Sequence, residues 1–82
     1  MTFLAVKLFA KARDLAGCEV VELDWTDGES VAELKQRLVG QFPKLAPLAA
    51  RLLVAVNNNY ATDGTMLNAT DEVACFPPVS GG

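Results

Sequence analysis

Histidine is absent from the 82-residue sequence, and cysteine occurs only twice. Without histidine, the chain lacks the commonest general base at neutral pH and the imidazole of a nucleophilic dyad. Cys18 and Cys75 lack the CxxC spacing of a zinc site, and two cysteines are too few for a disulfide scaffold. We therefore expect two free thiols, no metal site, no cofactor bound by this chain and no enzyme that works alone.

Nucleotide-binding loops, long apolar runs and an excess of basic residues are also missing. Neither G-x-G-x-x-G nor a P-loop occurs, so the chain has no pattern for holding a triphosphate. No stretch approaches the roughly 20 apolar residues of a membrane span, and Lys7 interrupts the apolar start before any cleavage pattern. A formal net charge of −3 argues against nucleic acid as a partner. We therefore expect a cytoplasmic protein that contacts neither membrane nor nucleic acid.

Apolar residues make up 51% of the chain, which is enough for the core of one small domain. Acidic residues are concentrated between positions 19 and 29, with no basic residue among them. A solvated acidic edge is the favoured interpretation of this run, and an electrostatic docking face is the alternative. Its members are Glu19, Glu22, Asp24, Asp27 and Glu29.

Period-two alternation predicts two strands in the first third of the chain. Residues 3–10 carry apolar side chains on both faces, which favours a strand inside the sheet. Residues 19–25 alternate acidic and apolar side chains, which favours an antiparallel partner with one wet face. Residues 11–17 between them are predicted to form one or two helical turns that end at Gly17. The positions predicted to face the core are Leu4, Val6, Leu8, Val21, Leu23 and Trp25.

A capped amphipathic helix is predicted next. Ser30 and Glu33 have the spacing of a capping box, in which each side chain accepts a hydrogen bond from the other residue's backbone N–H. Gly40 and Pro43 bracket the expected end of this helix. Apolar residues recur at helical spacing and form one stripe for packing on a sheet. The stripe consists of Val31, Leu34, Leu38 and Phe42.

The second half of the chain is predicted to complete the sheet. Residues 52–56 form a continuous apolar run, which predicts a buried strand, and residues 57–59 are three asparagines, which favour a turn. Residues 60–61 are expected to form a short strand, and residues 72–76 the last one. The order β-β-α-β-(β)-β predicts an α+β, β-grasp (ubiquitin-like) fold, in which one main helix packs on one face of a mixed sheet of four or five strands.

The chain is predicted to divide into a β-grasp domain, residues 1–76, and an extended tail, residues 77–82. Pro77 begins a double proline that ends the last strand, because proline fixes φ and removes a backbone donor. The tail closes with Gly81 and Gly82, whose lack of side chains would let it enter a narrow channel.

The carboxylate of Gly82 is the remaining group with reactive potential. A carboxylate resists nucleophiles at neutral pH, whereas an acyl-adenylate is electrophilic because AMP is a good leaving group. An ATP-using partner would have to supply that activation, since the chain has no nucleotide-binding pattern. The activated tail could then accept sulfide, which gives a thiocarboxylate, or an amine, which gives an isopeptide.

Three segments together resemble a known family. They are Leu8-Phe9-Ala10-Lys11-Ala12-Arg13-Asp14-Leu15-Ala16-Gly17, Val54-Ala55-Val56-Asn57, and Asp71-Glu72-Val73-Ala74 with Phe76-Pro77-Pro78-Val79-Ser80-Gly81-Gly82. The chain resembles the small, sulfur-carrier subunits of molybdopterin synthase over essentially its whole length, and the tail is the most specific match. It departs from them at Ala69-Thr70, where an Asp-Gly turn is common, and at Cys75, where an aromatic or aliphatic residue is common.

The resemblance implies a function and two partners. An adenylating enzyme related to ubiquitin activators would use ATP to charge Gly82, and a sulfur source would convert it to a thiocarboxylate. The tail would then enter the active site of the large synthase subunit and donate sulfur to cyclic pyranopterin monophosphate, forming the dithiolene of molybdopterin. The implied assembly is a heterotetramer of two small and two large subunits.

A docking patch is predicted beside the tail. If the alternation holds, Phe9 and Phe76 point away from the helix, and Tyr60 lies on the neighbouring turn. A cluster of exposed aromatic side chains indicates an interaction surface, unlike a single one. The expected reactive residues are therefore Gly82 and Gly81. The expected partner-binding residues are Phe9, Arg13, Tyr60, Phe76, Pro77, Pro78, Val79 and Ser80.

Other functions fit the same residues. The chain could be a ubiquitin-like modifier that is joined through Gly82 to lysines, or a sulfur carrier for a different thiolation pathway. It could also be a passive β-grasp interaction module whose tail has no chemical role.

Overall fold

The computed structural model describes residues 2–77. Its first strand, β1 (Phe3–Leu8), alternates exposed and buried side chains. Leu4, Val6 and Leu8 are buried, as predicted, and the residues between them are exposed. The strand ends two residues before the predicted limit, because Ala10 adopts a left-handed φ of 52° and starts helix α1 (Ala10–Ala16). Gly17 ends α1 as predicted, in a left-handed conformation with φ 79°.

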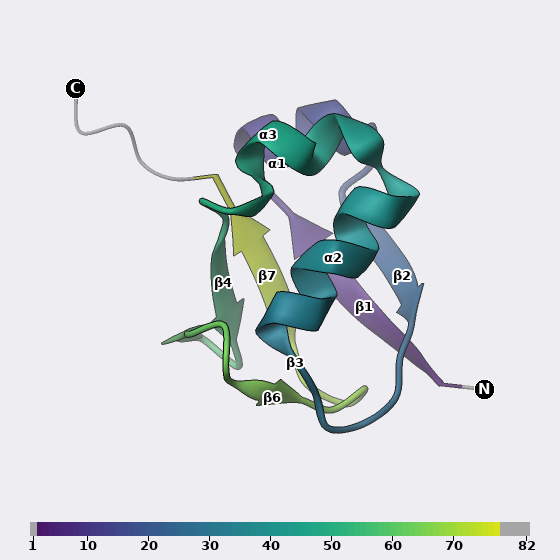
Figure 1. Ribbon diagram of the computed structural model, residues 1–82, viewed down its shortest axis with the longest axis vertical. Helices are drawn as coiled ribbons and strands as arrows, with labels where there is room; N and C mark the ends of the chain where they lie inside the picture. The colour runs from purple at the N-terminus through teal and green to yellow at the C-terminus, as the bar shows by residue number, and fades with distance from the viewer. Residues whose placement is uncertain (1, 78–82) are drawn as a thin grey trace.

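Five strands form one mixed sheet in the order β2-β1-β7-β4-β5. β1 runs parallel to β7 at the centre, and the other three pairings are antiparallel. The helix α2 crosses one face of this sheet (Figure 1). This arrangement is the predicted β-grasp, ubiquitin-like fold. The remaining strands are β2 (Val20–Asp24), β4 (Leu53–Val56), β5 (Asn59–Ala61) and β7 (Val73–Phe76).

The main helix, α2 (Val31–Gln41), begins at the predicted capping box. The backbone N–H of Glu33 donates to Ser30 Oγ at 3.4 Å, and that of Ser30 donates to Glu33 Oε1 at 3.0 Å. The helix ends at Gln41, between Gly40 and Pro43, as predicted. It is followed by a 3-10 turn, η1 (Pro43–Leu45), and by the short helix α3 (Ala46–Ala49). Within residues 2–77, no helix combines the length and the apolarity needed to cross a membrane.

A second, two-stranded sheet was not predicted. It pairs β3 (Glu29–Ser30) with β6 (Met66–Leu67) in antiparallel register. Strands of two residues are too short to show alternation, which explains why the sequence pattern missed them. Trp25 connects this small sheet to the core, because its buried Nε1 donates a hydrogen bond to the carbonyl oxygen of Leu67 at 3.0 Å.

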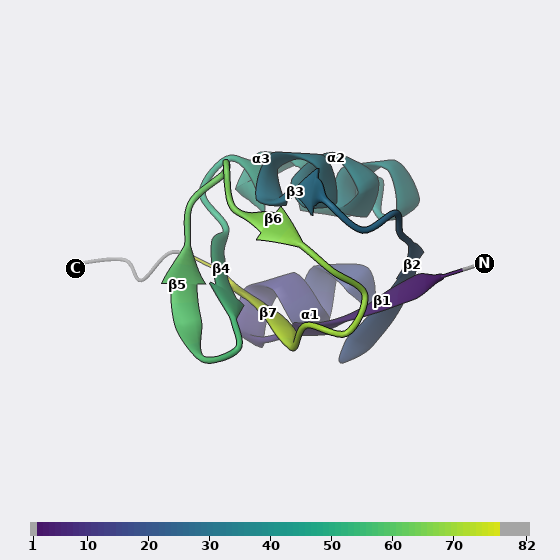
Figure 2. The ribbon, with the colours of Figure 1, turned by 90° about the horizontal axis from the view of Figure 1, so that it is seen from below.

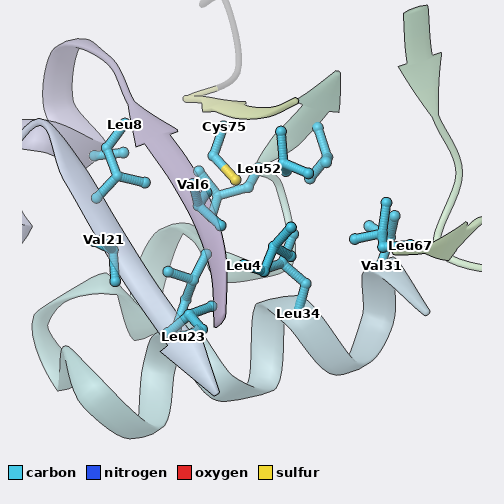
Figure 3. Packing of buried hydrophobic residues seen from close by; sticks show 14 of the residues in the cluster. Leu4, Val6, Leu8, Val21, Leu23, Val31, Leu34, Leu52, Leu67 and Cys75 are labelled. Carbon is cyan, nitrogen blue, oxygen red and sulfur yellow. The ribbon is translucent and has the colours of Figure 1, made fainter. Parts of the chain in front are cut away.

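A single apolar core fills the space between the large sheet and α2. Figure 3 shows side chains of β1, β2 and β7 pointing toward this helix, with Leu34 of α2 beside Leu4 of β1. α2 and α3 lie on the same side of the sheet (Figure 2). Cys75 is fully buried in this core, and burial raises the pKa of its thiol to about 12. It therefore acts as a core residue and stays protonated at neutral pH.

The predicted asparagine turn is present, but the run before it is not buried throughout. Asn57 and Asn58 take positive φ values of 51° and 70° and connect β4 to β5. Leu52 and Val54 are buried, whereas Leu53 is 39% exposed. The prediction of a wholly buried strand was wrong, because the core covers one face of β4 and Leu53 points to the other.

The capping box yields a prediction about stability. We expect Ser30→Ala to lower the free energy of unfolding by about 1 kcal/mol, because the backbone N–H of Glu33 loses its acceptor at the start of α2. Ser30→Asp retains an acceptor at this position and should keep most of the stability. Urea denaturation followed by circular dichroism measures both variants. Equal unfolding midpoints for Ser30→Ala and the unaltered chain would contradict this role of the cap.

Candidate functional site: the open face of the sheet

The face of the large sheet that points away from α2 is exposed or half-buried, and we call it the open face. Its side chains alternate along each strand with those of the core. Its members are Phe3, Ala5 and Lys7 from β1, Phe9 directly after β1, Val20, Glu22 and Asp24 from β2, Ala74 and Phe76 from β7, Leu53 and Ala55 from β4, and Tyr60 from β5.

Phe9 and Phe76 form a stack on the open face. Their ring centroids lie 4.9 Å apart and the ring planes differ by 11°. Aromatic pairs at this separation contribute roughly 0.5–1.5 kcal/mol beyond the area that they bury. Phe9 remains 39% exposed, so the stack presents an apolar surface to solvent. The predicted outward orientation of both rings is confirmed.

The backbone holds Phe9 in position for this stack. Its N–H donates to the carbonyl oxygen of Cys75 at 3.2 Å, which extends the parallel pairing of β1 with β7 by one residue. The next residue, Ala10, has the left-handed φ noted above, which costs an L-residue about 1–2 kcal/mol. This turn directs the chain into α1 immediately after Phe9, at the end of the open face where β7 also ends.

The other predicted partner-binding residues lie in different places. Tyr60 is 77% exposed on the open face, but β4 separates its strand from that of Phe76. Arg13 lies on α1, with Nη1 3.7 Å from Glu19 Oε1 and Nε 3.9 Å from Asp14 Oδ1. The structure therefore joins Phe9 to Phe76 and does not place Arg13 among the open-face side chains.

The tail begins at the aromatic stack. Pro77 directly follows Phe76 and is half-buried. The predicted tail residues Pro78, Val79, Ser80, Gly81 and Gly82 lie outside the described residues. The structure thus places the stack at the root of the predicted tail, and the role of the tail stays a prediction.

Leu53 is a candidate docking residue that the sequence reasoning missed. It is the direct cross-strand partner of Phe76, so Phe9, Phe76 and Leu53 form one apolar row across three strands. Alternation could have indicated its exposure, but the unbroken apolar run concealed the two faces of the strand. Beside this row lies a groove of about 370 Å³, lined in part by Ala55 and Ala74.

The opposite end of the open face is acidic. Glu22 lies beside Ala5 in the β1–β2 pair, and Asp24 lies beside Phe3. Glu72, just before β7, lines the groove, and its N–H donates to Asn57 Oδ1 at 2.9 Å. The run from Glu19 to Glu29 is therefore divided, with Glu22 and Asp24 on the open face and Glu29 in an ion pair with Arg37 at 2.6 Å.

Asp71 has a structural role next to this acidic end. The backbone N–H of Asn68 donates to its Oδ2 at 2.8 Å, and Asn57 Nδ2 donates to its Oδ1 at 3.1 Å. These hydrogen bonds lower the pKa of the Asp71 carboxyl. The N–H of Asp71 in turn donates to the carbonyl oxygen of Asn68 at 2.9 Å, which closes the turn around Ala69-Thr70.

Within residues 2–77, no three His, Cys, Asp or Glu side chains gather in a way that could hold a metal ion. Cys18 is partly buried, and its Sγ lies 3.9 Å from the carbonyl oxygen of Ala16.

Comparisons with known proteins agree with this description. The model of the ThiS family matches residues 6–82. A curated relative, the molybdopterin synthase sulfur carrier subunit of Escherichia coli, is 37% identical over 81 residues, which cover 96% of this chain and 99% of the relative.

Solved structures share the fold. The crystal structure of H. volcanii small archaeal modifier protein 1 has a TM-score of 0.84 at 30% identity, covering 96% of this chain and 100% of that one. A chain in the complex of subunits 1 and 2 of the molybdopterin-converting factor from Helicobacter pylori has a TM-score of 0.65 at 20% identity, covering 98% and 99%, which shows the fold alone. From the family match and the E. coli relative, we conclude that the chain belongs to the ThiS family.

Proposed function

We propose that this protein is the sulfur-carrier subunit of a molybdopterin synthase. The observation that carries the proposal is the stacked pair Phe9 and Phe76 on an uncovered sheet face, at the root of a tail with the sequence Pro77-Pro78-Val79-Ser80-Gly81-Gly82. An exposed apolar row beside a thin, reactive tail suits a domain that docks on an enzyme and inserts its terminus. The names of the curated relatives support the same function.

The proposed chemistry takes place at Gly82. Its carboxylate attacks the α-phosphate of ATP in an adenylating partner, and pyrophosphate leaves. A sulfur donor then displaces AMP and produces a thiocarboxylate. Apart from the Gly82 carboxylate itself, neither step requires a nucleophile, a metal or a cofactor from this chain, which agrees with the absence of histidine and the protonated state of Cys75. ATP is used by the partner and is not bound by the carrier.

The proposed acceptor is cyclic pyranopterin monophosphate in the active site of the large subunit. Sulfur from the charged tail forms the dithiolene of molybdopterin, and two charged carriers are consumed for each product. We propose a heterotetramer of two small and two large subunits, located in the cytoplasm. The open face would contact the large subunit while the tail reaches the reacting centre.

A second candidate function is protein modification. The solved relative from H. volcanii is named a small archaeal modifier protein, and the same adenylated Gly82 could react with a lysine amine to form an isopeptide. The match to the ThiS family also leaves open a carrier for another thiolation pathway. These functions share the activation step and differ in the acceptor.

Intact mass spectrometry distinguishes the candidates. The chain is co-expressed with the adenylating enzyme and a sulfur source, with the Gly82 deletion as a control that should fold normally and remain unmodified. A gain equal to the replacement of one oxygen by sulfur supports the carrier. A series of heavier conjugates supports the modifier, and an unchanged mass contradicts both.

The stack at the tail root predicts an effect on binding. We expect Phe76→Ala to weaken binding to the large subunit by about 1–3 kcal/mol, because an aromatic anchor is lost from the centre of the docking row. Isothermal titration calorimetry gives the affinity, and urea denaturation gives the stability. Met66→Ala serves as a control, since it removes an apolar side chain that is 64% exposed on the small sheet. Unchanged affinity together with a several-kcal/mol loss of stability would identify Phe76 as a core residue.

The thinness of the tail predicts an effect on transfer. We expect Gly81→Val to slow sulfur transfer about 100-fold or more while docking persists, because a β-branched side chain widens the tail and restricts its backbone just behind the reactive carbon. The variant is prepared with a synthetic C-terminal thiocarboxylate, which bypasses adenylation. Single-turnover conversion of the precursor by the large subunit is compared with that of the unaltered carrier. An equal rate would mean that glycine at position 81 is not needed for transfer.

A further inference from the structure

The open face has two chemically different ends. The apolar row of Phe9, Phe76 and Leu53 lies at the tail end. Ala5 lies four residues before Phe9, about 13 Å away along β1 at 3.3 Å per residue. In the row of Ala5, Glu22 lies on one side and Glu72, next to β7, lies on the other. The face is therefore apolar beside the tail and acidic away from it.

The carboxylates of Glu22 and Glu72 form no ion pair within the described part of the chain. In residues 2–77, neither Glu22 nor Glu72 has a Lys or Arg nitrogen within 4.0 Å. Two of the basic side chains are used by other carboxylates, since Arg37 pairs with Glu29 and Lys35 pairs with Asp63. Lys7 lies in the intervening row, opposite Val20 and Ala74.

Apolar contact alone does not define an orientation. The hydrophobic effect is non-directional, so a row of three apolar side chains would tolerate several rotations of the carrier on a partner. Charged groups at a fixed distance from that row remove this freedom, because only one rotation brings them against opposite charge. They also accelerate encounter, since a field of one sign attracts a partner of the other.

We propose that the acidic end of the open face, Glu22 and Glu72, pairs with a basic surface on the large subunit and sets the rotation in which the carrier docks. This inference rests on the proposed function and adds the chemistry of the partner. The partner would carry an apolar depression for the stacked rings near its active site, and lysine or arginine side chains about 13 Å further away. Docking in this rotation directs Pro77 and the tail toward the reacting centre.

The groove between the two ends supports this division. Its lining includes Phe9 and Phe76 at one end, Lys7, Ala55 and Ala74 in the middle and Glu72 at the other. The small side chains Ala55 and Ala74 leave room beside Lys7 for a partner's side chain to enter between the apolar and the acidic contacts. Asp71 contributes less to this contact, because its oxygens already accept hydrogen bonds from Asn68 and Asn57.

Association kinetics with the large subunit test the proposal. The double variant Glu22→Gln/Glu72→Gln removes two charges from the open face. The control Gln36→Lys/Gln41→Lys raises the net charge by the same amount on exposed positions of α2, on the other side of the molecule. All four positions are exposed, so both variants should fold, and thermal denaturation verifies this. Association rates are measured for each at low and at high ionic strength.

We expect the open-face variant to associate about tenfold more slowly at low ionic strength and to approach the unaltered carrier at high ionic strength, where charges are screened. The α2 control should stay within about twofold of the unaltered carrier. Equal slowing by both variants would show that only net charge matters and would overturn the proposal. An unchanged or faster rate for the open-face variant would also overturn it. If the unaltered carrier fails to associate with the large subunit, the proposed function itself is wrong.

Discussion

The parallel pairing of β1 with β7 is the interaction on which the rest of the structure depends. It brings the first and last strands of the chain together at the centre of the sheet, with Val6 beside Val73 and Leu8 beside Cys75. These four side chains enter the core under α2. Their alternate neighbours must then point to the other face, so the same register that forms the core also creates the open face.

This pairing also connects the fold to the tail. Phe9 continues the pairing by one hydrogen bond to Cys75 and then stacks on Phe76, the last residue before the prolines. The folded domain thus ends in an apolar row from which the predicted tail departs. In the proposed function, the body provides recognition, Gly82 provides the reactive carbon, and the partners provide ATP binding and catalysis.

The scarcity of reactive side chains in the described residues fits this division of tasks. The buried thiol of Cys75 is protonated, and the carboxylates cap a helix, form ion pairs or face solvent. The carboxylates at the acidic end of the open face form no ion pair within residues 2–77, and they lie about 13 Å along the sheet from the stack at the tail root. They are well placed to orient the body on a partner, which is how a surface without catalytic groups can influence a reaction.

Local patterns in the sequence by themselves determined the capping box at Ser30, the ending of α1 at Gly17 and the buried faces of β1 and β2. Each depends on hydrogen bonds or alternation within a few residues, so the sequence shows it directly. Only the tertiary structure decided that Leu53 is exposed, that two-residue strands pair as a second sheet, and that Phe9 stacks on Phe76. These features depend on which strands become neighbours and which face α2 covers, and such contacts join residues that are distant in the chain.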